Sequence, residues 1–289
     1  MMQRTYTYHR WAWLTYLLVG MFAAVGFCRV VTAVGWYVNA ESVQNLFAGT
    51  GVNEEALTYI NEWGGLPRLM EALLMLQAMP LFCLWIWRMA LNTRGLETRG
   101  HVHSPVGGAL VFASIAIFSM AYHITLSASG TLYLIAQETG AKAPWAAAVG
   151  ITAFLLVLQL MLLTRAVSVL REIWRASLPD SSVIDTEDWL RSRESLYIVD
   201  GWFLLTLVAI FVPLVQVLPM RSPGMFGWMS MTWARITGEV IVAIWSLSTI
   251  RLLLVLDKRQ VRRLRFIRSQ QVEKQAVESH RVEAFAVVK

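Results

Sequence analysis

Six long apolar stretches dominate this 289-residue chain and restrict what it can fold into. Each is longer than the roughly 20 residues that an α-helix needs to cross about 30 Å of hydrocarbon. Because a backbone in lipid must satisfy its own hydrogen bonds, the stretches predict helices. The sequence therefore predicts an all-α, polytopic membrane protein, a bundle of about six transmembrane helices. The stretches lie at about 11–38, 69–91, 106–136, 144–170, 198–219 and 233–256.

The composition supports a lipid bilayer as the solvent of this chain. Hydrophobic residues make up 56% of it and charged residues only 15%, whereas roughly 25% of the residues in a soluble domain are charged. The thirteen Trp residues suit many helix ends at a membrane surface, because the amphipathic indole favours that interface. The net charge of +6 is explained by basic connecting segments, so we predict no nucleic-acid partner.

Basic residues are distributed unevenly between the connecting segments, and this asymmetry predicts the orientation of the chain. The segments assigned to the outside hold only Arg68, Lys142 and Arg221 as basic residues. The segments assigned to the cytoplasm hold many more, so the positive-inside rule places both termini in the cytoplasm. The predicted outer segments are 39–68, 137–143 and 220–232, and the inner ones are 1–10, 92–105, 171–197 and 257–289.

The same pattern predicts a six-helix transmembrane domain over 1–256 and a basic cytoplasmic tail over 257–289. A bacterial inner membrane is the predicted location, with an organellar membrane as the alternative. The first apolar stretch follows basic residues, as a signal peptide does, but it runs nearly 28 residues. The apolar region of a signal peptide has only about 7–15 residues, so we interpret this stretch as a retained helix.

Two connecting segments carry signals for short helices at the membrane surface. In segment 39–68, Asn53 can cap a helix that begins at Glu54, and the Gly-Gly-Leu-Pro run after Trp63 is expected to end it. Segment 176–197 has a turn followed by a polar stretch that leads into the fifth crossing. We therefore expect short interfacial helices in both segments.

Six polar side chains fall in the outer half of the predicted bilayer and come from five of the predicted helices. Ionisable residues inside a membrane are costly, and they are functional candidates by default. Two of the six, Arg235 and Glu239, are separated by one helical turn and share a face. The full set is Arg29, Glu71, His123, Gln216, Arg235 and Glu239.

Two interpretations of this polar set compete. In the structural one, Arg29 pairs with Glu71 or Glu239 and holds the bundle together, because a buried charge needs a partner. In the functional one, the six groups line an outward-facing pocket for an ion, a proton or a polar headgroup. His123 would then be the titrating member, since its unperturbed pKa is the nearest to neutrality. In a third interpretation, the members of the set nearest the membrane surface extend their polar ends to the water interface and keep their apolar stems in the bilayer.

A dense group of basic residues follows the sixth apolar stretch. Such a group predicts contact with anionic lipid headgroups on the cytoplasmic side, and the simpler alternative is an anchor that only fixes topology. Val261, Leu264 and Ile267 recur at every third position, so one face of this segment can also dock on a partner. The basic residues are Lys258, Arg259, Arg262, Arg263, Arg265 and Arg268.

Signatures of catalysis and cofactor binding are sparse. A b-type haem between helices usually needs two axial His ligands, and only His123 lies within a predicted crossing. Cys28 and Cys83 both fall in apolar stretches, where a packing role is expected. No P-loop occurs. We therefore predict no catalytic residue, no metal site and no cofactor within this chain alone.

The function predicted from these observations is a structural subunit of a larger inner-membrane complex. Its partners would be other membrane protein subunits or further copies of the chain. Two alternatives stay open. One is a small channel or transporter that uses Arg29, Glu71, His123 and Glu239. The other is a membrane subunit of a metal- or haem-dependent oxidoreductase whose centre is completed by other chains.

Overall fold

The computed structural model describes residues 10–40, 54–95, 104–177, 186–221 and 223–287, and within these ranges it contains helices and no strand. Six of the helices are long and apolar enough to cross a membrane. This confirms the predicted all-α class and the predicted number of apolar helices. The helices are α1 (Ala12–Val38), α3 (Glu54–Gly95), α4 (Pro105–Thr139), α5 (Lys142–Ala176), α6 (Thr186–Arg221) and α7 (Pro223–Val287).

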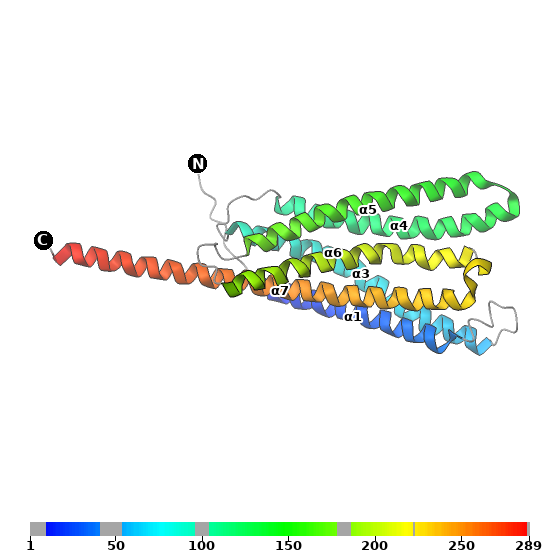
Figure 1. The fold of residues 1–289 in the computed structure, drawn as a ribbon, viewed down its shortest axis with the longest axis horizontal. Helices are drawn as coiled ribbons and strands as arrows, with labels where there is room; N and C mark the ends of the chain where they lie inside the picture. The colour runs from blue at the N-terminus through cyan, green and yellow to red at the C-terminus, as the bar shows by residue number, and fades with distance from the viewer. Residues whose placement is uncertain (1–9, 41–53, 96–103, 178–185, 222, 288–289) are drawn as a thin grey trace.

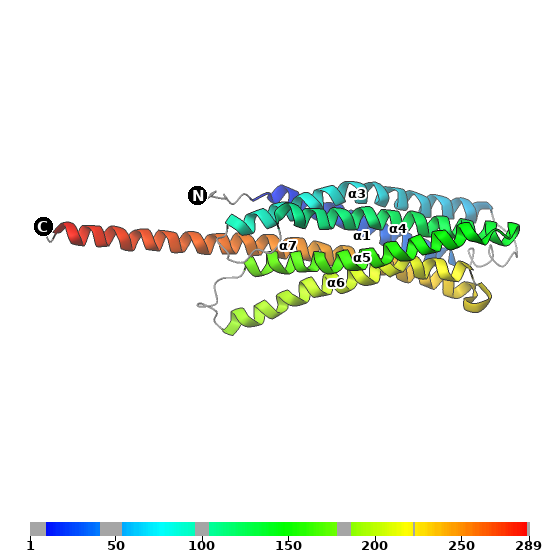
Figure 2. The same ribbon diagram turned by 90° about the horizontal axis from the view of Figure 1, so that it is seen from above.

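The helices lie side by side along one axis, and their contacts follow a closed order (Figure 1, Figure 2). Helix α1 packs between α3 and α7, α6 packs between α7 and α5, and α4 packs between α5 and α3. We call the end where α1 begins and from which α7 projects the tail end. The other end, where α4 and α5 are joined, is the opposite end.

All six helices contribute to the main hydrophobic core, which lies toward the tail end. Trp85 and Trp202 are among its largest buried side chains, and the ring of Phe82 contacts those of Trp85, Phe22 and Phe112. A smaller cluster of buried residues joins α4 to α5 farther toward the opposite end. The packing that fixes the order of the helices is therefore concentrated in one half of the bundle.

The α4–α5 hairpin has a clear start and a clear turn. Ser104 caps α4 by accepting a hydrogen bond from the backbone N–H of Gly107 at 2.9 Å, and Pro105 follows at the first helical position. At the other end, Gly140 has a φ of 74°, a left-handed conformation that glycine adopts without steric cost. The chain therefore reverses within two residues and enters α5 at Lys142.

Two predicted connections are helical in the structure. The Gly-Gly-Leu-Pro run does not end a separate helix, because α3 passes through Pro67 without interruption. Proline is tolerated inside apolar helices when the freed carbonyl finds another partner or the helix bends. The described residues of segment 220–232 are helical as well, since α6 runs to Arg221 and α7 begins at Pro223. The fold thus gives no separate interfacial helix in the described part of segment 39–68.

The tail continues the last apolar helix directly. Helix α7 has 65 residues and extends past the other helices as a single rod (Figure 1). Leu256 is fully buried, Ile267 is half-buried, and the described side chains from Arg268 to Val277 are all exposed. We call the segment from Arg268 to Val287 the α7 extension.

A closed set of hydrogen bonds joins α6 to α7 inside the bundle. Trp202 donates from Nε1 to Oγ1 of Thr249 at 3.1 Å, and that hydroxyl donates to the carbonyl of Trp245 at 3.0 Å. Trp245 in turn donates to Oγ1 of Thr206 at 2.9 Å, and Thr206 donates to the carbonyl of Trp202 at 2.7 Å. Each helix carries Trp followed four positions later by Thr, so antiparallel packing makes the bonds reciprocal.

Replacing Thr249 with Val is expected to lower the free energy of unfolding by about 1 kcal/mol, because it leaves the indole N–H of Trp202 without an acceptor in a buried place. Denaturant titration of the purified protein in mild detergent measures this loss. The matched control is Thr164→Val, which removes an exposed hydroxyl on α5 and should change stability far less. Equal effects of the two substitutions would contradict a stabilising role for the reciprocal bonds.

Candidate functional site

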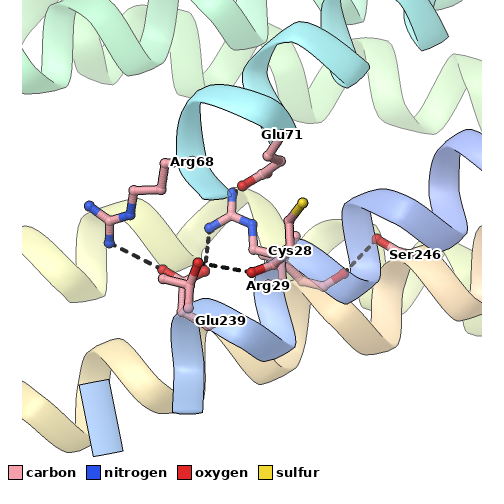
Figure 3. A network of polar contacts seen from close by, with 8 residues as sticks. Cys28, Arg29, Arg68, Glu71, Glu239 and Ser246 are labelled. Atoms are coloured by element: carbon pink, nitrogen blue, oxygen red, sulfur yellow. Dashed lines mark hydrogen bonds and ion pairs between the residues drawn. The ribbon is translucent and has the colours of Figure 1, made fainter. Parts of the chain in front are cut away.

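Charged side chains from three helices meet in the half of the bundle that lies toward the opposite end (Figure 3). Arg29 of α1 lies between two carboxylates: its Nη2 is 2.5 Å from Oε1 of Glu71, and its Nη1 donates to Oε2 of Glu239 at 2.5 Å. Arg68 of α3 donates to the other oxygen of Glu239 at 3.3 Å. We call these four residues the ionic cluster.

The local sequence explains why these groups meet. Helix α1 packs between α3 and α7, so a long side chain from α1 reaches both neighbours. Arg68 and Glu71 are three positions apart on α3 and therefore share a face. Gly26 lies one turn before Arg29, and a β-carbon there would be 3.4 Å from Cβ of Ser246. Helices α1 and α7 thus lie in van der Waals contact beside the cluster.

Burial shows how strongly the ionic cluster depends on its own pairing. Glu239 has no exposed surface, and Glu71 is only 8% exposed. An ionised carboxylate in such a place is stable only if cations and hydrogen bonds replace its solvent. Arg29 is the cation paired with both carboxylates. The side chain of Arg68 is 43% exposed, so it links the cluster to the surface of the protein.

An aromatic side chain borders the ionic cluster toward the opposite end. The guanidinium of Arg235 lies 4.5 Å from the centre of the Trp36 ring, and that of Arg68 lies 5.8 Å from the same ring. A guanidinium over an indole face is attracted by the ring quadrupole. Trp36 therefore connects α1 to both α3 and α7 a second time, beyond the ion pairs.

The structure brings together three members of the predicted polar set and separates others from them. Arg29, Glu71 and Glu239 are paired as the structural interpretation requires, and Arg235 lies beside them on Trp36. His123 is exposed on α4, and its Nδ1 is 2.7 Å from the carbonyl oxygen of its own helical neighbour at position 119.

One predicted residue of the polar set is not tested by the structure, and two residues at the site were not predicted. The side chain of Gln216 in α6 lies outside the described residues, so its predicted place in the polar set stays a prediction. Arg68 and Trp36 were not among the predicted site residues. Arg68 was assigned to a surface segment because a helix end was expected just before it. Its position three residues before Glu71 was the signal that could have identified it.

A second set of polar contacts joins the helices at the tail end. Arg10 forms an ion pair with Asp257 at 2.9 Å, directly after the apolar part of α7. Gln260 accepts a hydrogen bond from Nδ2 of Asn92 at 3.3 Å and donates to the carbonyl of Met89 at 3.0 Å. These contacts fasten α7 to the N-terminal segment and to α3 at the point where α7 leaves the bundle.

The six basic residues of the tail separate into two groups. Arg259 and Arg263 turn toward the protein: the guanidinium of Arg259 lies 3.9 Å from the centre of the Trp174 ring, and Arg263 is 7% exposed. The other four are exposed. We call this exposed group the basic stripe, and its members are Lys258, Arg262, Arg265 and Arg268.

The chemistry available in the described part of the chain is limited. No group of three or more His, Cys, Asp or Glu residues that could hold a metal ion occurs in the described ranges. Both carboxylates of the ionic cluster are already engaged by Arg29. The arrangement is therefore suited to holding three helices together, and it offers no open carboxylate for acid–base chemistry.

Comparisons with known proteins give no further assignment. No model of a protein family matches the chain, and no curated protein and no solved structure matches it either.

Proposed function

We propose that the protein is a structural subunit of a larger complex in a bacterial inner membrane, with both termini in the cytoplasm. The observation that carries this proposal is the α7 extension, a helix whose described side chains are exposed up to Val277. Its function would be to fix a partner protein to the membrane surface, while the six apolar helices anchor it in the bilayer.

The α7 extension is difficult to explain as an isolated element. Most helical stability in proteins comes from packing one face against other parts of the protein, and the described side chains of the extension pack against none. A helix without a packed face bridges between domains, is stabilised by many ion pairs one turn apart, or is not stable by itself. Val272 and Val277 of the extension are 66% and 64% exposed, so apolar surface is available for such a contact.

The ionic cluster supports a structural role for the bundle. Its carboxylates are buried and paired, and the guanidinium of Arg29 on α1 links the two helices that provide them, α3 and α7. A pathway for ions or protons needs groups that exchange partners with water. The structural pairing is therefore the simpler function of the cluster, and the transporter remains the competing proposal.

Purification in a mild detergent, followed by mass spectrometry of the intact assembly, tests the complex-subunit proposal. We expect stoichiometric foreign subunits to accompany the chain. A homo-oligomer or monomer without a partner would overturn the proposal and favour transport through the bundle.

Glu239→Gln separates the two functions in the same preparation. The amide can still accept a hydrogen bond from Arg29, but the charge is lost. In a structural subunit, we expect assembly to weaken or stay unchanged, and proton or K⁺ flux into proteoliposomes to stay at background before and after the substitution. Flux in the unsubstituted protein that disappears in the variant, with assembly intact, would favour the transporter. Glu138→Gln, on the surface of α4, is the matched control.

A further inference from the structure

We propose that the basic stripe is a docking site for an acidic face of a partner protein, aligned with α7 on the cytoplasmic side. This inference rests on the proposed function, because it specifies the chemistry of the partner that such a subunit would bind. The sequence predicts six equivalent basic residues in the tail. The structure assigns only four of them to a continuous exposed surface.

The geometry of the helix makes the four cations one surface. Lys258, Arg262, Arg265 and Arg268 are separated by four, three and three positions, so successive members lie about one helical turn apart on the same side. Arg259 and Arg263 lie on another side, against Trp174 and within the protein. The stripe is therefore a linear array of positive charge on the exposed side of α7, along the stretch where this helix leaves the bundle.

Electrostatics favours an anionic partner along this whole array. Like charges three or four positions apart on a helix repel each other and destabilise it. Among the described residues, no ion pair is recorded for any member of the stripe, whereas Asp257 at its start is paired with Arg10. An acidic surface along α7 would remove this repulsion and stabilise the helix as it binds.

The direction of α7 favours a protein over lipid headgroups. The helix continues along the axis of the bundle and does not turn to lie across its end (Figure 1, Figure 2). At about 1.5 Å of rise per residue, Arg268 lies roughly 15 Å beyond Lys258. A headgroup layer is only about 5–8 Å thick, and exposed charges are screened beyond about 8 Å at physiological ionic strength. Headgroups would therefore reach Lys258 and Arg262, while Arg265 and Arg268 need another counter-charge.

The contacts at the tail end keep the stripe in this position. Gln260 follows Lys258 by two positions, is fully buried on the other side of α7 and bonds to α3, and the ion pair of Asp257 lies one residue before Lys258. The start of the stripe is thus held at a fixed orientation to the bundle. A partner that binds it would be placed at a defined angle to the membrane.

The test uses the full-length protein in lipid nanodiscs and poly-L-glutamate as the acidic probe. We expect binding that weakens at high salt and falls about fivefold to tenfold in Arg265→Gln/Arg268→Gln, because two exposed charge pairs are lost. Arg265→Lys/Arg268→Lys keeps the charge and should bind nearly as the unsubstituted protein does. Binding that is equal in the Gln and Lys variants would overturn the proposal.

Two further measurements identify the natural counter-charge. A photo-crosslinking residue at Ser269, which is exposed one turn after Arg265 on the same side of α7, is expected to label a foreign subunit in native membranes at a segment rich in Asp and Glu. This labelling should be lost in Arg265→Gln/Arg268→Gln. Labelling of lipid alone, or probe binding replaced by vesicles of phosphatidylglycerol, would overturn the assignment to a protein. If foreign subunits still accompany the Gln variant in full amount, the acidic face is refuted while the complex-subunit function stands.

Discussion

Replacing Arg29 with Gln is expected to lower the free energy of unfolding by about 3–5 kcal/mol. Arg29 is the group that pairs with both buried carboxylates, and its removal leaves Glu71 without this cation and Glu239 with only the 3.3 Å contact to Arg68. Breaking a buried ion pair is costly because the remaining charge has lost solvent as well as its partner. Denaturant titration in mild detergent, followed by the fluorescence of the many Trp residues, measures the loss.

Two control variants show whether the loss comes from unpaired charge. Arg29→Lys keeps the positive charge but not the two-sided geometry of the guanidinium, so we expect an intermediate loss. In Arg29→Leu/Glu71→Leu/Glu239→Leu all three charges are absent, and replacement of buried ion pairs by apolar residues is often neutral. This triple variant should therefore be more stable than Arg29→Gln. A loss below about 1 kcal/mol for Arg29→Gln would contradict the pairing as a source of stability.

Hydropathy alone was enough to predict the number of apolar helices, because each stretch must satisfy its backbone internally whatever its neighbours are. It also led to the three central members of the ionic cluster, since Arg29, Glu71 and Glu239 are costly in apolar surroundings without partners. Their positions along the predicted helices placed all three residues in the same half of the predicted bilayer. Both results follow from the hydropathy of single stretches and from the position of a residue within its stretch. Neither property depends on how the helices pack against one another.

The features that the sequence did not predict depend on neighbours or on backbone adjustment. The continuity of α3 through Pro67 could not be read from the Gly-Gly-Leu-Pro run, which is typical of helix ends. The exposure of His123 depends on which face of α4 meets its neighbours. The same holds for the tail, where only the packing of Trp174 distinguishes Arg259 from the exposed Arg262.

Removing residues 268–289 is expected to abolish co-purification of the partner while the bundle keeps its stability within about 0.5 kcal/mol. Among the described side chains of α7, Ile267 is the last that is half-buried, and none of those beyond it belongs to the hydrophobic core. The deletion also removes Arg268, so it takes away one end of the basic stripe. Intact-assembly mass spectrometry and denaturant titration of one preparation measure both quantities.

A single substitution shows whether partner binding needs a straight helix or only the residues that the deletion removes. Gln271→Pro keeps every other residue, but proline in a helix interior costs about 3 kcal/mol relative to alanine and breaks or bends the rod. We expect it to weaken partner binding strongly, and Gln271→Ala to leave binding unchanged. From Arg268 to Val287 the rod measures roughly 30 Å at about 1.5 Å per residue, so a bend near its start moves its far end by a large fraction of that length. If the deletion variant keeps a stoichiometric partner, the partner is held by the bundle or by the remaining members of the basic stripe, and the α7 extension has another role.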